Sequence, residues 1–170
     1  MKKPWSKLTL VLAAVTLVVV LLSVPGSLRQ SIERGNFYVF SAAFFEDLPK
    51  RLAGPGRFRF ILQPLIATFL GIRSGLVDAR MGRPAYLFGL LFDDKLRREL
   101  MRSGFRSIVN LILMGILLDS ICQWLILGAS YPGAALLVGP VLIAAPYSIS
   151  RALTNRCARL ARNSRKAAGE

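Results

Sequence analysis

The sequence contains no histidine, only nine acidic residues and only two cysteines. Without histidine the chain lacks both the side chain that ordinarily titrates near neutral pH and the commonest metal ligand. Cys122 and Cys157 form neither a CxxC pair nor a metal-binding spacing, so we interpret each as a small apolar side chain. Nucleophile motifs, a P-loop and a GxGxxG sequence are missing as well. These absences predict a protein without catalytic activity, cofactor or metal site.

The few acidic residues stand against 23 Lys and Arg residues, which gives a net charge of +14. The positive residues flank apolar blocks, and no aromatic-rich or zinc-finger module accompanies them, which argues against nucleic-acid binding. Hydrophobic residues make up 54% of the chain and the mean hydropathy is +0.49, more than an ordinary soluble domain carries. The pattern predicts an integral membrane protein whose basic segments meet anionic lipid headgroups.

Three segments are apolar and long enough to predict membrane-spanning helices. Leu8 to Val24 has 17 residues without charge, near the lower limit for a hydrocarbon core of about 30 Å. Its basic leader MKKPWSK also fits a signal peptide, but the run exceeds a typical signal-peptide core and no A-x-A site follows, so we expect an uncleaved anchor over about 8–25. Segments 107–127 and 133–150 are joined by the uncharged turn GASYPG and predict a helical hairpin.

A fourth span is expected over 58–79, although only 13 of its residues, Phe60 to Ile72, lie between charges, a length that also fits an interfacial or re-entrant segment. As one helix the segment would rise ~33 Å, with arginines near both ends extending toward the headgroups. Small residues recur at every fourth position of this segment, and such a stripe lets a neighbouring helix come close in lipid. The stripe consists of Ala67, Gly71, Gly75 and Ala79. The alternative is that the two glycines only loosen a helix end.

Two topologies fit these segments. Four spans with a cytoplasmic N-terminus place 17 Lys and Arg residues inside and 6 outside. Three spans with the N-terminus outside place 20 inside and 3 outside, but the remaining loop of about 80 residues is too long for the positive-inside rule to be reliable. We therefore expect a single all-α membrane domain over 1–170: a four-helix transmembrane bundle in the bacterial inner membrane, with both termini cytoplasmic.

Amphipathic interfacial helices are expected between the spans. Asn36 to Arg57 combines an aromatic cluster with charges and is predicted to lie along the outer interface. The aromatic residues expected to enter the headgroup region are Phe37, Tyr38, Phe40, Phe44 and Phe45. Asp93 to Arg106 opens with acidic residues suited to a helix start and predicts a cytoplasmic helix with Leu96, Leu100 and Met101 on one face.

The basic tail, 151–170, is interpreted as a lipid anchor. Its cationic residues at helical spacing are predicted to contact anionic headgroups. They are Arg156, Arg159, Arg162, Arg165 and Lys166.

Asp119 is the only ionisable residue inside the three longest apolar segments. A charged carboxylate at the centre of a span costs about 2.5 to 3.5 kcal/mol, so it must face protein or water, or be protonated. Gln123 lies one turn further along, and Gln63, four residues before Ala67, falls at a matching depth in an antiparallel helix. We predict that Asp119 packs on the small-residue stripe and hydrogen-bonds Gln63 as a neutral acid. The alternative is a proton or cation site, although no second acid, lysine or histidine joins Asp119 in the spans.

One spacing resembles a known enzyme signature. Ala79 and Arg80, then eight residues, Gly89, three residues and Asp93 resemble the latter half of the CDP-alcohol phosphatidyltransferase signature, whose family uses four aspartates to hold two metals. The departures are Ile72 and Gly75 at the first two aspartate positions, Leu76 at a glycine position and Arg97 at the fourth aspartate position. A single matching aspartate cannot build a two-metal site, so the resemblance implies at most a non-catalytic remnant.

A broader resemblance covers about two thirds of the chain, from Gly54 onward. The stretch GPGRFRFILQPLIATFLGIRSGLVDARMGRPAY, with ALLVGP and APYSISRALTNR, is similar to a group of multi-pass inner-membrane proteins of bacteria that has no assigned activity. It implies a location and carries over no functional residue.

Three functions are compatible with these features. The first is a non-catalytic inner-membrane protein that acts by helix packing, as a homo-oligomer or with a membrane-protein partner. The second is a small transporter or channel component with Asp119 as a proton or cation site. The third is a degenerate membrane enzyme of the phosphoalcohol-transferase type.

Overall fold

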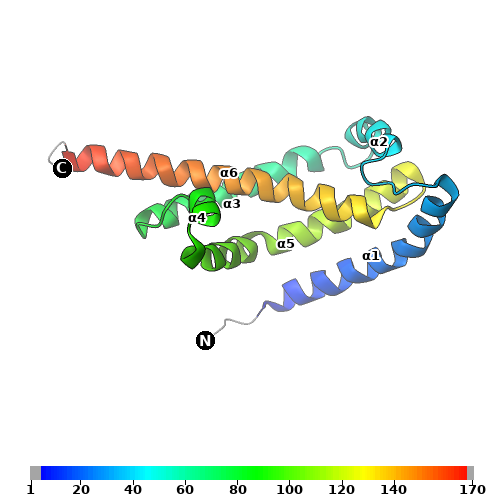
Figure 1. The fold of residues 1–170 in the computed structure, drawn as a ribbon, viewed down its shortest axis with the longest axis horizontal. Coiled ribbons are helices and arrows are strands. Elements are labelled where there is room, and N and C mark those ends of the chain that lie inside the picture. The colour runs from blue at the N-terminus through cyan, green and yellow to red at the C-terminus, as the bar shows by residue number, and fades with distance from the viewer. Residues whose placement is uncertain (1–4, 168–170) are drawn as a thin grey trace. The chain divides into compact units, whose positions relative to one another are not determined.

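The computed structural model of the protein describes residues 5–167, with all of their side chains except those of 34 and 165–167. This part of the chain is all-helical, without a strand (Figure 1). The helices are α1 (Lys7–Arg34), α2 (Ala42–Ala53), α3 (Arg59–Arg80), α4 (Tyr86–Phe92), α5 (Asp94–Leu127) and α6 (Pro132–Ala167). The all-α prediction is confirmed.

Four of the helices, α1, α3, α5 and α6, are long and apolar enough to cross a membrane. Even the shortest of them, α3, has 22 residues and rises ~33 Å, which exceeds a hydrocarbon core of about 30 Å. The structure therefore contains the four long apolar helices of the four-span prediction, including the segment that the sequence left least certain.

The helices extend beyond the predicted spans. Helix α1 continues through Pro25 to Arg34 and ends at Gly35, whose φ of 70° is the left-handed conformation typical of a glycine helix end. A proline is tolerated inside a membrane helix because neighbouring groups satisfy the freed backbone. Helix α5 joins the predicted amphipathic helix and the third span, and α6 joins the fourth span and the tail.

The start of α5 confirms the predicted acidic helix start. The carboxylate oxygen Oδ1 of Asp93 accepts hydrogen bonds from the backbone N–H groups of Lys95 and Leu96, both at 3.1 Å. These are N–H groups that have no partner within the first turn of a helix. Leu100, on the same helix, is buried, whereas Met101 is exposed.

The chain forms two compact units, each with its own set of internal contacts, and α3, α5 and α6 contribute residues to both. Unit 1 comprises Met1–Gln63 and Val109–Leu142, and unit 2 comprises Pro64–Ile108 and Ile143–Glu170.

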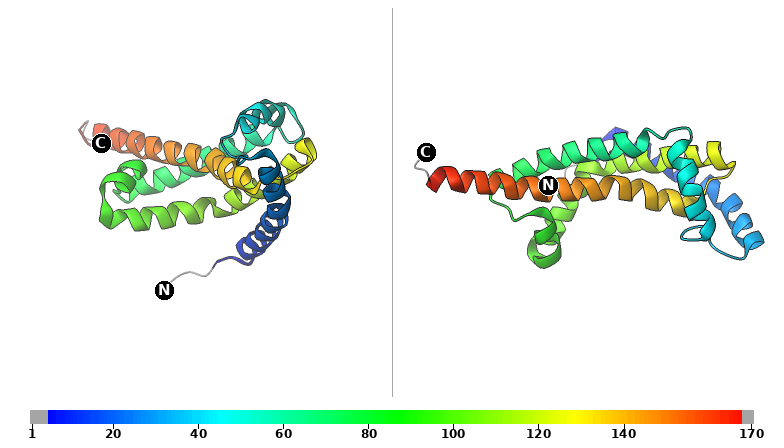
Figure 2. Two further views of the ribbon diagram at one scale, coloured as in Figure 1. Left: turned by 45° about the vertical axis from the view of Figure 1, so that its right-hand side comes forward. Right: turned by 90° about the horizontal axis from the view of Figure 1, so that it is seen from above.

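In unit 1, α1 lies beside the second half of α5, and α2 lies at the turn between α5 and α6 (Figures 1 and 2). The hydroxyl of Thr9 donates to Asn110 Oδ1 at 2.8 Å, which ties α1 to α5 by a polar contact. Hydrogen bonds between side chains of neighbouring helices stabilise packing in lipid, where burial of apolar surface contributes little.

Two residues of the predicted aromatic cluster, Tyr38 and Phe44, belong to a buried hydrophobic cluster of unit 1 rather than to an interfacial patch. Tyr38 stacks on Tyr131 with ring centroids 3.6 Å apart, and the edge of Phe44 meets Tyr38 at 5.8 Å. Tyr38 and Phe44 are buried, so the prediction that they enter the headgroup region is wrong. Phe37, Phe40 and Phe45 are exposed.

In unit 2, α3 and α6 approach closely at two glycines. A Cβ atom added to Gly71 would lie 2.5 Å from the carbonyl oxygen of Tyr147, and one added to Gly75 would lie 2.5 Å from that of Arg151. Ala67 and Ala79 of the same stripe are buried as well. The helix that meets the two glycines is α6, whereas the prediction placed the helix of Asp119 there.

Candidate functional site

Asp119 lies in unit 1 at a centre of buried polar side chains and is only 1% exposed. Its Oδ1 forms a close ion pair with Nη2 of Arg59, and its Oδ2 lies 3.8 Å from Nη1 of Arg51. The Nε2 group of Gln123 donates to Oδ2 at 2.5 Å. The expected hydrogen bond between Asp119 and Gln63 is therefore wrong, because the partners of the carboxylate are Arg59, Arg51 and Gln123.

The turn between α2 and α3 brings the two arginines to Asp119. Its sequence AGPG ends α2 at Ala53, two residues after Arg51, and α3 begins at Arg59. A Cβ atom on Gly56 would lie 2.5 Å from Sγ of Cys122, and the φ of Gly56 is +78°. Only glycine combines that conformation with so close an approach to α5. Cys122 is buried at this contact, in the apolar packing role expected of it.

A hydrogen-bond network leads from Asp119 to the surface of unit 1. Gln123 Oε1 accepts the backbone N–H of Tyr131 at 2.8 Å, and the Tyr131 ring stacks on Tyr38. The hydroxyl of Tyr38 accepts from Nη2 of Arg51 at 3.2 Å and donates to Asp47 at 2.9 Å.

This network shifts the titration of its outer members. Burial raises the pKa of Tyr38 well above its usual value, although the nearby Arg51 guanidinium opposes the shift. Partial burial of Asp47 favours its neutral form, but hydrogen bonds from Lys50 and Tyr38 outweigh this and hold the pKa of the carboxyl below its usual value.

The centre carries more positive than negative charge. Arg51 and Arg59 are 1% and 3% exposed, and Asp119 is the one acid that pairs with them within the described residues. Gln63 is 5% exposed, and its Nε2 group has no acceptor in residues 5–167. Asp119 and Gln123 thus belong to the centre as predicted, but sequence analysis missed both arginines. Arg51 was placed in an interfacial segment, and Arg59 was expected to extend from the end of span 58–79 toward the headgroups.

Unit 2 contains a second buried polar cluster that the sequence did not reveal. Arg151 and Asp78 are 2% and 1% exposed, and the guanidinium donates to both carboxylate oxygens, from Nε at 2.6 Å and from Nη2 at 3.1 Å. Nη1 of Arg151 donates to the hydroxyl of Tyr147 at 2.9 Å, and Nη2 also donates to Ser103 at 3.0 Å. The Tyr86 ring centroid lies 4.2 Å from Arg151 Cζ. This cluster joins α3, α5 and α6 within unit 2.

An open cleft of about 400 Å³ lies beside this cluster. Three arginines and one acid line it, together with three serines and two apolar residues. The lining consists of Leu70, Arg73, Ser74, Val77, Asp78, Arg83, Ser103, Ser107 and Arg151. Arg83 is held by Glu99 at 2.5 Å and lies 3.7 Å from Asp78. Arg73 is exposed and forms no ion pair with any described residue.

The predicted lipid-contacting arginines extend from α6. Arg156, Arg159 and Arg162 are exposed, and Arg159 also donates to the carbonyl oxygen of Arg83 at 3.4 Å. The side chains of Arg165 and Lys166 lie outside the described residues.

Asp93 and Arg97, at the last two aspartate positions of the phosphatidyltransferase signature, make hydrogen bonds at helix ends. Asp93 caps the start of α5, and Arg97 donates to the carbonyl oxygens of Leu90 and Leu91, at 2.8 and 3.0 Å, at the end of α4. Within residues 5–167, no group of three or more Cys, Asp or Glu side chains is placed to hold a metal ion.

Comparison of the chain with protein families, with curated proteins and with solved structures gave no match.

Proposed function

We propose that the chain is a non-catalytic membrane protein that binds the phosphate group of an anionic phospholipid in the arginine-lined cleft of unit 2. The observation that carries the proposal is the cleft itself, in which three arginines face a single acid. Of these, Arg73 has no competing carboxylate in the described residues, so its guanidinium is free to receive an anion.

The chemistry of the cleft suits a lipid rather than a free anion. Leu70 and Val77 line the same face of α3 as Arg73, so an acyl chain would meet apolar side chains beside the phosphate. Ser74 of α3 lines the cleft as well, and because its hydroxyl oxygen accepts from Tyr147 at 3.3 Å, its own proton can be donated to the headgroup. Basic pockets between membrane helices on the cytoplasmic side are typical binding places for anionic headgroups.

The proposed location supports the same assignment. With four spans and a cytoplasmic N-terminus, 17 Lys and Arg residues lie in cytoplasmic segments and 6 outside, as the positive-inside rule favours. The connection from α3 to α5, which contains Arg83, is then cytoplasmic. The proposal therefore places the cleft at the inner leaflet of a bacterial inner membrane, with both termini in the cytoplasm.

The other candidate functions have less support. Arg59, Arg51 and Gln123 surround the carboxylate of Asp119, which disfavours a cation site there. Asp93 already caps α5, which disfavours a metal-dependent transferase. Gly71 and Gly75 are covered by α6 within unit 2, so the stripe is not a free surface for another chain.

The test is a lipid titration of the purified protein in nonionic detergent. Adding phosphatidylglycerol should raise the thermal unfolding midpoint saturably and leave lipid bound in native mass spectra, whereas phosphatidylcholine should do neither. Arg73→Gln removes a charge-assisted contact of about 1.5 to 3 kcal/mol, so the apparent lipid affinity should fall about tenfold or more.

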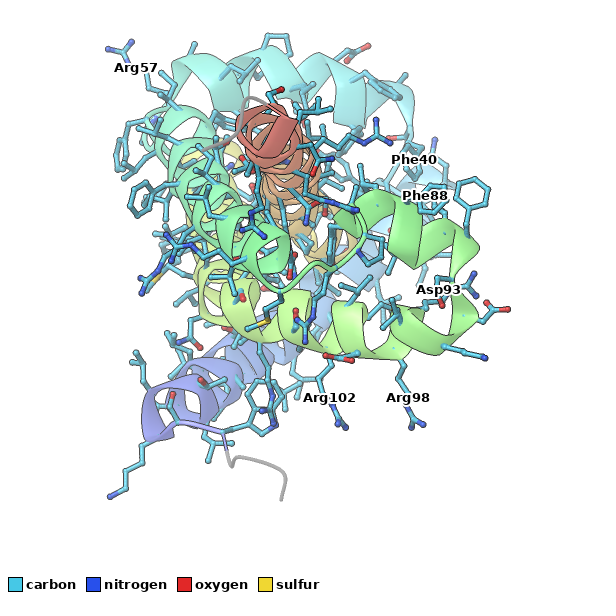
Figure 3. The ribbon with its side chains drawn as sticks, turned by 90° about the vertical axis from the view of Figure 1, so that its left-hand side faces the viewer. Phe40, Arg57, Phe88, Asp93, Arg98 and Arg102 are labelled. Atoms are coloured by element: carbon cyan, nitrogen blue, oxygen red, sulfur yellow. The ribbon has the colours of Figure 1, made fainter. Side chains whose placement is uncertain are left out.

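Arg98→Gln is the matched control, because Arg98 is exposed, projects away from α5 and does not line the cleft (Figure 3). This variant should keep the affinity of the unmodified protein. If both variants weaken binding equally, the lipid responds to overall charge and the cleft is not its site.

A further inference from the structure

We infer that unit 1 binds one small monovalent anion between Arg51 and Arg59, next to Asp119. The inference concerns a different site from the lipid cleft and does not depend on it. It rests on three observations about the buried centre: its charge, its unpartnered donors and its enclosure.

The charge of the centre is incomplete. Two buried guanidinium groups flank one buried carboxylate, which leaves one positive charge without a counterion. Asp47 acts electrostatically on Arg51, but it forms its ion pair with Lys50 and is linked to Arg51 only through the hydroxyl of Tyr38. A buried charge is stable only when it is paired and hydrogen-bonded, so the centre calls for one further negative charge.

The unpartnered polar atoms at this centre are mainly donors. Within the described residues, Nε of Arg51 and Nε and Nη1 of Arg59 are buried and have no acceptor, and the same holds for Nε2 of Gln63, one turn after Arg59 in α3. The acceptor Oδ1 of Asp119 makes no hydrogen bond either, but it is ion-paired with Arg59. Nη1 of Arg51 also lacks an acceptor, since its distance of 3.8 Å from Asp119 is too long for a hydrogen bond. A set of N–H donors with excess positive charge selects an anion over a cation.

Contacts with aromatic rings do not replace the anion. The Cζ atom of Arg51 lies 5.7 Å from the ring centroids of both Tyr38 and Phe44, and Arg59 Cζ lies 4.8 Å from that of Phe60. The negative faces of these rings attract the guanidinium groups, but they offer no lone pair to the N–H groups. The need for an acceptor therefore persists.

The enclosure of the site limits the size of the ligand. Arg51, Arg59, Gln63 and Asp119 are at most 5% exposed. A halide or nitrate ion can be enclosed by such a set, whereas a bulky organic anion such as gluconate cannot. The monovalent charge follows from the balance of two arginines against one aspartate.

The experiment uses the full chain in nonionic detergent without lipid. Sodium gluconate is replaced stepwise by chloride, bromide or nitrate at constant ionic strength, and the thermal unfolding midpoint is measured. A bound anion stabilises the folded state by mass action, so the midpoint should rise saturably by a few degrees. A midpoint that does not change when the small anions replace gluconate means that water satisfies the donors, and the inference is wrong.

Arg51→Met tests the site directly. It removes the excess charge and leaves Arg59 paired with Asp119, so the folded variant should lose the anion dependence. Arg57→Met is the matched control, since Arg57 lies between Arg51 and Arg59 in the chain but is exposed and extends away from the protein (Figure 3). It should keep the anion dependence. An unchanged response in Arg51→Met, or a loss in Arg57→Met, would place the ion elsewhere and overturn the assignment.

Asp119→Asn provides a second, opposite test. This change leaves two buried guanidinium groups without a carboxylate, so half-saturation should occur at a lower chloride concentration than in the unmodified protein. A folded Asp119→Asn variant whose half-saturation is unchanged or higher contradicts the inference. If this variant does not fold, the comparison of Arg51→Met with Arg57→Met decides alone.

Discussion

Arg151 and Asp78 form a two-point ion pair inside unit 2, with Nε and Nη2 of the guanidinium 2.6 and 3.1 Å from the two carboxylate oxygens. The residues are 73 positions apart in the chain, and both are almost completely buried. The planar guanidinium matches a carboxylate at two points, a geometry that lysine cannot supply. The pair therefore fixes α3 against α6 in one relative position.

Removing one partner of this pair should be more damaging than removing both. Asp78→Ala leaves the Arg151 guanidinium buried without a counterion and should lower the free energy of unfolding by about 3 to 5 kcal/mol. The double variant Asp78→Leu with Arg151→Met removes the stranded charge, so it should be more stable than Asp78→Ala alone. Equilibrium unfolding in mixed micelles measures both. If the stability losses of the single variants Asp78→Leu and Arg151→Met add up to the loss of the double variant, the two side chains are not coupled.

The contact between α3 and α6 should depend on the absence of a side chain at Gly75. A Cβ atom there would lie 2.5 Å from the backbone oxygen of Arg151, which cannot move without displacing α6. Gly75→Ala should therefore cost about 1 to 3 kcal/mol of stability. The control is Gly26→Ala in α1, where nothing lies within 4 Å of the added Cβ. Because alanine has the better helix propensity, this change should raise the free energy of unfolding by about 0.5 to 1 kcal/mol. Similar losses in the two variants would contradict the close packing.

The helices could be predicted from the sequence because hydropathy and helix-end signals are local. Long uncharged runs marked three of the four long apolar helices, and Asp93 marked the start of α5. Segment 58–79 was the hardest to assign because charges interrupt it, yet one of these charges, Arg59, is buried against Asp119. An arginine that finds a counterion inside the protein does not prevent a helix from being buried.

The two arginine partners of Asp119 could not be predicted, because they lie outside the apolar run that contains Asp119 and Gln123. Gln63 is the polar residue that the sequence places at a matching depth in another span. The structure instead brings Arg51 from the amphipathic helix α2 and Arg59 from the first residue of α3. The turn at Gly54 and Gly56, which folds onto α5, makes this approach possible. Tyr38 and Phe44 were misassigned for a similar reason, since an aromatic cluster near a predicted interface can also bury itself against a partner such as Tyr131.

The topology predicts the side of the membrane on which the connection after α1 lies. A reporter inserted after Arg34 should be active in the periplasm, because the proposed cytoplasmic N-terminus and the long helix α1 place residue 35 outside. A fusion after Arg83, between α3 and α4, serves as the opposite control and should report the cytoplasm. A cytoplasmic signal at both positions would contradict a four-span arrangement.

Tyr38 should make the folded protein less stable at high pH. Burial raises the pKa of its hydroxyl above the value of about 10 expected in an unfolded chain. As the pH rises past that value, the unfolded state loses its tyrosine proton first, so the stability of the folded state decreases progressively above pH ~10. Tyr38→Phe keeps the ring on Tyr131 but removes this titration, and should flatten the decrease.

The measurement is the difference in tyrosinate absorbance between the unmodified protein and Tyr38→Phe. Taking a difference is necessary because burial also raises the pKa of Tyr86. Difference absorbance that develops at the pH of a free tyrosine would contradict the burial of Tyr38 against Tyr131.

Asp93 should act as a helix cap, and its substitutions separate this role from metal chemistry. Asp93→Ala removes the acceptor of two backbone N–H groups at the start of α5 and should cost about 1 kcal/mol of stability. Asp93→Asn keeps a cap of nearly equal strength, so its stability should match that of the unmodified protein, although an amide is a much poorer ligand for Mg²⁺ than a carboxylate. Thermal unfolding midpoints of the two variants provide the comparison. A Mg²⁺-dependent rise in the midpoint of the unmodified protein that Asp93→Asn abolishes would instead support the transferase-like alternative, because capping does not require a metal ion.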